Sequence, residues 1–126
     1  MKSFVLASGE LPYMISAYII LCGDDMIIVI SGGEKEHVGA VALGSPRASL
    51  ENSQNISSNA SLLCLLGHKD DILAREAALR LSRKYNKNVV VTVGIHIDRA
   101  TGDDLKKVEK NFHVILNMIE DIMVAI

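Results

Sequence analysis

A glycine, a histidine, a lysine and two aspartates stand together in the middle of the chain, as Gly67-His68-Lys69-Asp70-Asp71. They follow the apolar run 62–66 and precede an amphipathic run, 72–85, with helical spacing. A turn from a strand into a helix exposes the free N–H groups of the first helical turn, and glycine lets a ligand approach the backbone closely. With an imidazole and an ammonium beside these donors, the turn favours an anion such as a phosphate.

The two aspartates also have a simpler interpretation. A short carboxylate at the start of a helix accepts its unpaired N–H groups and complements the positive end of the helix dipole. We therefore expect Asp70 or Asp71 to cap a helix over residues 71–85, with or without a ligand. Capping does not account for His68 and Lys69, so both interpretations stay open.

A second candidate group, His96-Ile97-Asp98, ends the clearest strand pattern of the chain, Val89 to Asp98. The strand expected over Ile56 to Leu66, the helix after it and this strand should form a right-handed βαβ unit with parallel strands. Their carboxyl ends then meet at one edge of the sheet, where ligands of open α/β sheets bind. Gly94, on the same face as His96, is expected to leave room there for a flat or bulky group.

The N-terminal half is expected to form an antiparallel meander of strands over 3–7, 13–22, 26–30 and 37–43. The second of these is apolar on both faces, a pattern typical of strands covered on both sides. His37 and Gly39, in the fourth strand, are expected to approach the same sheet edge. Residues 44–55 have no period and predict a long loop, either a lid whose Arg47 reaches an anion or a disordered surface connection.

The last segment opens with Thr101-Gly102-Asp103-Asp104, a variant of the helix capping box. Apolar side chains then recur at steps of three and four to the last residue. This pattern predicts a helix that covers the sheet, with residues 118–126 apolar enough to share their burial with a partner subunit.

Length and composition bound the class of protein. The 126 residues fit one domain, and a hydrophobic fraction of 49% without tryptophan predicts an aliphatic core, in which Cys22 and Cys64 are reduced. A net charge of −2 argues against a broad nucleic-acid-binding surface. The longest apolar run is about half of a membrane-spanning helix, so we expect a cytoplasmic protein. The predicted fold is α+β: a mixed, largely antiparallel sheet with one βαβ crossover and two long helices.

Three functional classes follow from the residues alone. His68, His96, Asp70 and Asp98 could form the open metal site of a small histidine-based enzyme, although no local ligand spacing supports it. No catalytic residue is assigned, because the serines lack a strand-elbow-helix signature and the glycine-rich nucleotide-binding signatures are absent. A site that binds without turnover fits best, and an assembly module without a ligand is the third class.

Three blocks of residues carry, by their order, a resemblance to a known family: Ser31-Gly32-Gly33 with His37-Val38-Gly39-Ala40, Gly67-His68-Lys69-Asp70-Asp71, and Thr92-Val93-Gly94-Ile95-His96-Ile97-Asp98. Over roughly residues 26–112 the chain resembles the LpdD-like accessory proteins of gallate and related hydroxyarylic-acid decarboxylases. The resemblance implies a homo-oligomeric chaperone that binds prenylated FMN or FMN and serves a prenylated-flavin-dependent decarboxylase. It also implies a fold similar to that of proteasome assembly chaperones.

The residue patterns and the resemblance together predict one site. His68, Lys69 and the helix N-terminal amides would bind the flavin phosphate, Arg47 would close over it, and His37 and His96 would contact the ribityl chain or the ring. The predicted cofactor-binding set is His37, Gly39, Arg47, Gly67, His68, Lys69, Asp70, Asp71, Gly94, His96 and Asp98.

Overall fold

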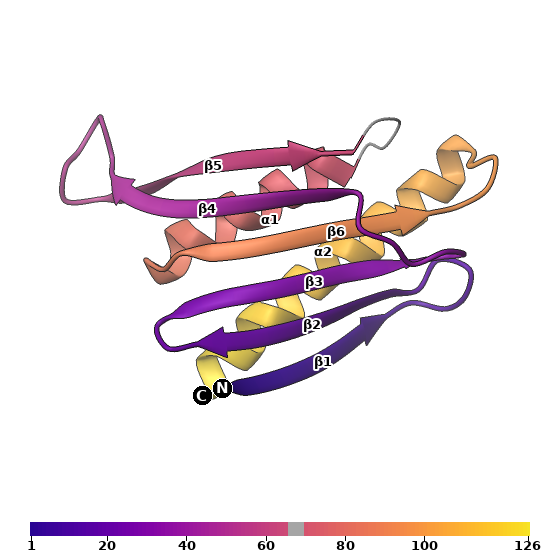
Figure 1. Ribbon diagram of the computed structural model, residues 1–126, viewed down its shortest axis with the longest axis horizontal. Helices are drawn as coiled ribbons and strands as arrows, with labels where there is room; N and C mark the ends of the chain where they lie inside the picture. Colours follow the sequence, from indigo (N-terminus) through magenta and orange to yellow (C-terminus); the bar gives the residue numbers. More distant parts are fainter. Residues whose placement is uncertain (66–69) are drawn as a thin grey trace.

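The computed structural model describes residues 1–65 and 70–126 of the chain. They form one six-stranded sheet and two helices (Figure 1). The strands are β1 (Lys2–Ser8), β2 (Ile15–Cys22), β3 (Asp25–Gly33), β4 (Ala40–Ala48), β5 (Ile56–Cys64) and β6 (Val89–His96), and the helices are α1 (Asp70–Tyr85) and α2 (Gly102–Ala125). The predicted α+β class, with a mixed and largely antiparallel sheet, is confirmed.

The strand order in the sheet is β1-β2-β3-β6-β4-β5. β1, β2 and β3 form the predicted antiparallel meander, with β1 at the edge. The fourth strand does not continue the meander, because β6 pairs parallel with β3 and separates it from β4. That step of the prediction is wrong, since the chain after β3 crosses over β6 instead of turning back beside β3 (Figure 1).

Both helices cover the same face of the sheet, with α2 behind β1, β2 and β3 and α1 behind β4 and β5 in Figure 1. Side chains between these layers form the core, and Ile28, Val91, Leu81 and Phe112 are fully buried there. Neither helix lies on the opposite face. The prediction that residues 13–22 are covered on both sides is therefore wrong for a single chain, and Tyr18 is 45% exposed on the uncovered face.

α1 packs closely on the sheet because the side chains on its inner face are small. Ala74, Ala77 and Ala78 are fully buried. A side chain on Gly44 of β4 would come within 2.3 Å of the main-chain oxygen of Ala78, so glycine is required at that point of contact. The helix spans the range that the apolar spacing predicts, and one end of it reaches the edge of the sheet where β6 ends.

α2 begins at the predicted capping box, where the Thr101 hydroxyl accepts the Asp104 N–H at 3.2 Å and the Asp104 carboxylate accepts the Thr101 N–H at 2.9 Å. Hydrogen bonds from the Thr101 backbone and then from the Tyr13 hydroxyl lower the pKa of Asp104. The middle of the predicted apolar stripe, from Val108 to Ile119, is buried, whereas Leu105 at its start and Ile126 at its end are exposed. In the described part of the chain, no helix has the length and apolar composition needed to cross a membrane.

The predicted loop over residues 44–55 is partly strand. β4 runs on to Ala48 and pairs with β5, so only residues 49–55 connect the two strands. At Pro46, β4 has passed the start of β6 and pairs with β5 only. A proline, which has no N–H to donate, is tolerated in a strand with one unpaired side. The Gly-Ser-Pro sequence that suggested a loop is thus part of a strand.

The two cysteines also differ from the prediction. Cys22 and Cys64 are free thiols, as expected, but both are exposed rather than buried. Each cysteine is the last residue of its strand. The apolar residues before it suggested burial, but the core ends before the strand does.

Candidate functional site

The carboxyl ends of β5 and β6 lie at the same edge of the sheet, as predicted. β4 pairs antiparallel with both strands, which makes β5 and β6 parallel to each other although β4 separates them. The N-terminal end of α1 reaches this edge, since the Asp70 carboxylate accepts the main-chain N–H of Ile95 at 3.1 Å. Gly67, His68 and Lys69 lie outside the described residues, so their predicted contact with a phosphate stays a prediction.

His37 and Gly39 reach the same edge through a segment that we call the strap, residues 34–39. It connects β3 to β4 and crosses over β6 on the face without helices (Figure 1). Main-chain hydrogen bonds hold it at both ends, from the Glu34 N–H to the His96 oxygen at 2.7 Å and from the Gly39 N–H to the Val93 oxygen at 2.9 Å.

The strap fills the space that Gly94 was predicted to leave for a ligand. A Cβ atom on Gly94 would lie 1.5 Å from the main-chain oxygen of His37. Glycine is therefore needed at this position so that one segment of the chain can cross another. The prediction of an open space above Gly94 is wrong, because the protein's own backbone occupies it.

Asp70 is the polar centre of this edge. The residue is 5% exposed, and its carboxylate bonds with one oxygen to the Ile95 N–H and with the other to Nε2 of His37, at 3.2 Å. The carboxylate needs the space beside Gly39, where a Cβ would lie 1.9 Å from it. Asp70 thus joins the start of α1, the strap and β6, which is a wider role than the predicted helix cap.

Among the described residues of this edge, His37 and His96 lie close together but are differently engaged. Their rings lie 6.3 Å apart, edge to face. Nδ1 of His37 faces the Lys35 main-chain oxygen at 3.2 Å and Nε2 faces Asp70, so hydrogen bonds occupy both ring nitrogens. His96 bonds through Nε2 to Asp98 at 2.7 Å, and its ring is partly exposed. His96 is therefore the histidine whose second nitrogen can meet a ligand.

An open pocket of about 280 Å³ lies beside these rings and is lined by Lys35, His37, Val38, Leu65 and His96. Three of these residues, Lys35, Val38 and Leu65, were not in the predicted set. Lys35 lies two residues after β3, which ends in Gly32-Gly33, and a lysine just after a glycine pair is the signal that could have identified it. It supplies positive charge at this pocket.

Arg47 does not belong to this edge. It lies near the far end of β4, seven residues from Ala40, which at about 3.3 Å per residue is about 23 Å along the strand. Its guanidinium donates to the Asn59 side chain at 2.9 Å and to the Ala48 main-chain oxygen at 3.0 Å. The prediction that Arg47 closes over the same ligand is wrong, because the loop assigned to it is strand.

The predicted metal alternative depends on a residue that the structure does not describe. In residues 1–65 and 70–126, no three histidine, cysteine or acidic side chains gather closely enough to hold a metal ion. Asp98 and Asp70 bond to different histidines, His96 and His37. A metal site here would therefore require His68 and a rearrangement of these pairs.

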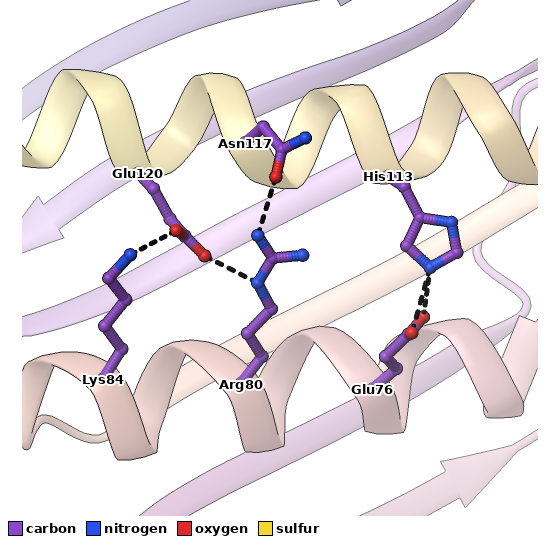
Figure 2. A network of polar contacts seen from close by, with 6 residues as sticks. All are labelled: Glu76, Arg80, Lys84, His113, Asn117 and Glu120. Carbon is purple, nitrogen blue, oxygen red and sulfur yellow. Dashed lines mark hydrogen bonds and ion pairs between the residues drawn. The ribbon is translucent and has the colours of Figure 1, made fainter.

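A row of polar contacts joins α1 to α2 and holds the helix that carries Asp70 (Figure 2). His113 bonds to Glu76 at 2.9 Å, Arg80 bonds to Glu120 at 2.6 Å and to Asn117 at 2.8 Å, and Lys84 also bonds to Glu120. Burial raises the pKa of Glu120, but hydrogen bonds from Lys84 and Arg80 outweigh it and lower the pKa below its ordinary value. These contacts fix α1 against α2.

The chain is similar to proteins of known family and structure. Residues 9–123 match a family described as the prenylated flavin chaperone LpdD-like domain. Protein LpdD of Lactiplantibacillus plantarum is 27% identical over 89 residues, which cover 71% of this chain and 62% of that protein, less than two thirds of its length. A chain from the crystal structure of a novel chaperone complex for yeast 20S proteasome assembly matches with a TM-score of 0.61. At 21% identity, over 98% of this chain and 95% of that one, this similarity establishes the fold alone.

Proposed function

Because the chain belongs to the prenylated flavin chaperone LpdD-like family, we propose that it is a non-catalytic chaperone that binds prenylated FMN or FMN. In this proposal it assists the maturation of a prenylated-flavin-dependent hydroxyarylic-acid decarboxylase. The family match over residues 9–123 is the observation that carries the proposal. The chemistry of the pocket at the sheet edge supports it.

The pocket offers the three kinds of group that a flavin requires. The Lys35 ammonium suits the phosphate, Val38 and Leu65 suit the apolar part of the ring, and His96 can donate or accept a hydrogen bond at the flavin edge. Gly67, His68, Lys69 and the amides at the start of α1 remain predicted phosphate donors. Asp70 and His37 hold the strap in place beside the ligand.

The size of the pocket bears on how a flavin would be held. Its volume of about 280 Å³ is below the range of about 300–1,000 Å³ that is usual for pockets enclosing a small molecule. It would therefore hold one end of the flavin and leave the other end exposed. Partial enclosure suits a protein that must release its ligand to an enzyme.

The proposal is tested by titrating FMN and prenylated FMN with purified protein and following the flavin fluorescence. We expect Lys35→Ala and His96→Ala each to weaken binding by about 10-fold or more, as loss of a hydrogen bond to a charged group would. The same loss is expected for His68→Ala and Lys69→Ala. Arg47→Ala is the matched control, because it removes a cation at the other end of β4 and should leave the affinity unchanged.

Wild-type affinity in all four site variants would contradict the assignment of the pocket, and failure of the wild-type protein to bind either flavin would contradict the function itself. The absorption spectrum and mass of any small molecule released on denaturation identify the ligand directly. A stoichiometric transition metal in the purified protein would favour the histidine-based enzyme instead.

A further inference from the structure

β5 is one edge of the sheet, and among the described residues it pairs with β4 alone. Two main-chain hydrogen bonds show how this pair is oriented, from the Leu65 N–H to the Gly39 oxygen at 2.9 Å and from the Ser49 N–H to the Asn55 oxygen at 2.8 Å. Both join odd-numbered residues, and the register between them is unbroken. Bonded and non-bonded positions alternate in an antiparallel pair, so the odd-numbered residues of β5 bond to β4.

The even-numbered residues of β5 therefore direct their main-chain N–H and C=O groups away from β4, toward the free edge. They are Ile56, Ser58, Ala60, Leu62 and Cys64. Pro46, which has no N–H, stands opposite Ser58 and agrees with this alternation. The Ser58 hydroxyl donates to the Leu79 oxygen of α1 at 2.8 Å, so the side chains of the same residues face α1. The helix covers this face of β5 and lies behind the strand in Figure 1.

β5 lacks the features by which edge strands usually prevent pairing with another chain. Such strands carry charged side chains, prolines or bulges. The nine residues of β5 include no charge and no proline, and they pair with β4 without a bulge. The other edge strand, β1, begins with Lys2. Leu63, on the side of β5 away from the helices, is 76% exposed. The edge of β5 is therefore suited to accept a further strand.

The side of α1 above this edge carries a positive charge. Leu79 lies against β5, as its contact with Ser58 shows. Arg75 is one helical turn before Leu79 on the same side of α1 and is exposed. In residues 1–65 and 70–126, no carboxylate pairs with its guanidinium. A strand placed beside β5 would turn alternate side chains toward this guanidinium, and a carboxylate there would form a charge-assisted pair.

We propose that the edge of β5 binds an extended segment of another protein, which adds to the sheet as a further strand. Main-chain hydrogen bonds to the even-numbered residues supply the affinity, and alternate side chains supply the selectivity. The segment has acidic residues on the side that faces Arg75 and apolar residues on the side that faces Leu63. The inference goes beyond the proposed function and does not depend on a flavin ligand.

The probe for the test is a peptide as long as β5 in which valine and glutamate alternate, with a fluorescein label for fluorescence polarisation. A matched probe has lysine in place of glutamate, and another has all of its peptide nitrogens methylated. We expect the glutamate probe to bind about 10-fold more tightly than the lysine probe, because attraction to Arg75 replaces repulsion. The methylated probe should not bind, because it cannot donate to the strand edge.

Ala60→Pro tests the edge from the side of the protein. It removes an N–H that points away from β4 and leaves the bonds to β4 in place, so the strand should tolerate it. We expect it to weaken binding of the glutamate probe by at least about 10-fold. Ala60→Ser keeps the N–H and should bind as the wild-type protein does. Full affinity in Ala60→Pro, or binding of the methylated probe, would overturn the proposal.

Arg75→Glu tests the selectivity. It should reverse the preference, so that the lysine probe binds more tightly than the glutamate probe. Lys106→Glu makes the same change of charge on an exposed position of α2, which lies behind β1, β2 and β3, and should keep the wild-type preference. Equal binding of the two probes by the wild-type protein would overturn the assigned partner chemistry.

Amide hydrogen exchange of the wild-type protein, followed by NMR, needs no variant that must fold. In the free protein, the amides of Ser58, Ala60 and Leu62 should exchange faster than those of Asn59 and Ser61, which bond to β4. The glutamate probe should slow exchange at the first three. Slowing at the strap alone would overturn the proposal. Slowing at β5 when only the protein concentration rises would also overturn it, because a second copy would then occupy the edge.

Discussion

Replacement of Asp70 by alanine should unfold the edge of the sheet more than any other single change at the site. Asp70 is 5% exposed, and its carboxylate bonds to the Ile95 N–H at 3.1 Å and to the His37 ring at 3.2 Å. A hydrogen bond to a charged group contributes about 1.5–3 kcal/mol, and both of these bonds are long, so the lower value applies to each. We expect Asp70→Ala to lower the free energy of unfolding by about 3 kcal/mol.

Urea denaturation followed by circular dichroism measures this change, and the midpoint of thermal unfolding should fall by about 10 °C for a domain of this size. Asp71→Ala is the matched control, because it removes a neighbouring carboxylate at the same helix end, an effect of about 0.3–1 kcal/mol. Asp70→Asn keeps one acceptor for the Ile95 N–H and should fall between the two. If Asp70→Ala and Asp71→Ala lose the same stability, Asp70 does not join the strap, β6 and α1 as described.

Two further predictions concern the packing of the strap and the contact between the helices. Gly94→Ala should lower the free energy of unfolding by about 1–3 kcal/mol in the same urea assay, because its methyl group would displace the His37 oxygen. Gly102→Ala is the control and should not destabilise the chain, because a methyl group there has no atom within 4 Å. Glu120 has a lowered pKa when folded, so it stabilises the protein above its unfolded pKa of about 4.3, and this contribution is lost as the pH falls through the folded value. Glu120→Gln should therefore reduce the loss of stability between pH 6 and pH 3, and an unchanged pH dependence would show that this ion pair contributes nothing.

Features set by short stretches of sequence were predictable. Neighbouring residues determine the capping box at Thr101, the extent of α1 and the positions of the first three strands. The structure confirms each of these predictions. The common edge for the ends of β5 and β6 was also predictable, because strands joined by one helix in a crossover run in the same direction.

Features that depend on distant pairing were not predictable. The sequence between β3 and β4 is consistent with a hairpin, and only the insertion of β6 turns it into the strap. Gly94 and Gly39 resemble ligand-binding glycines in sequence, but each makes room for another part of the chain, the His37 oxygen and the Asp70 carboxylate. Arg47 was misplaced for a related reason, since Pro46 beside it suggested a loop where β4 has a neighbour on one side only.

The strap also limits how anything can lie on the face of the sheet that the helices leave uncovered. It crosses over Gly94 at one end of β6, where the His37 main-chain oxygen occupies the space above the glycine, and it forms a raised bar there. A flat body that rests there cannot slide past this bar, so its possible positions are shifted toward the other end of the strands. The pocket of Lys35 and His96 lies beside the bar. A molecule held in the pocket would therefore meet any body that rests on this face.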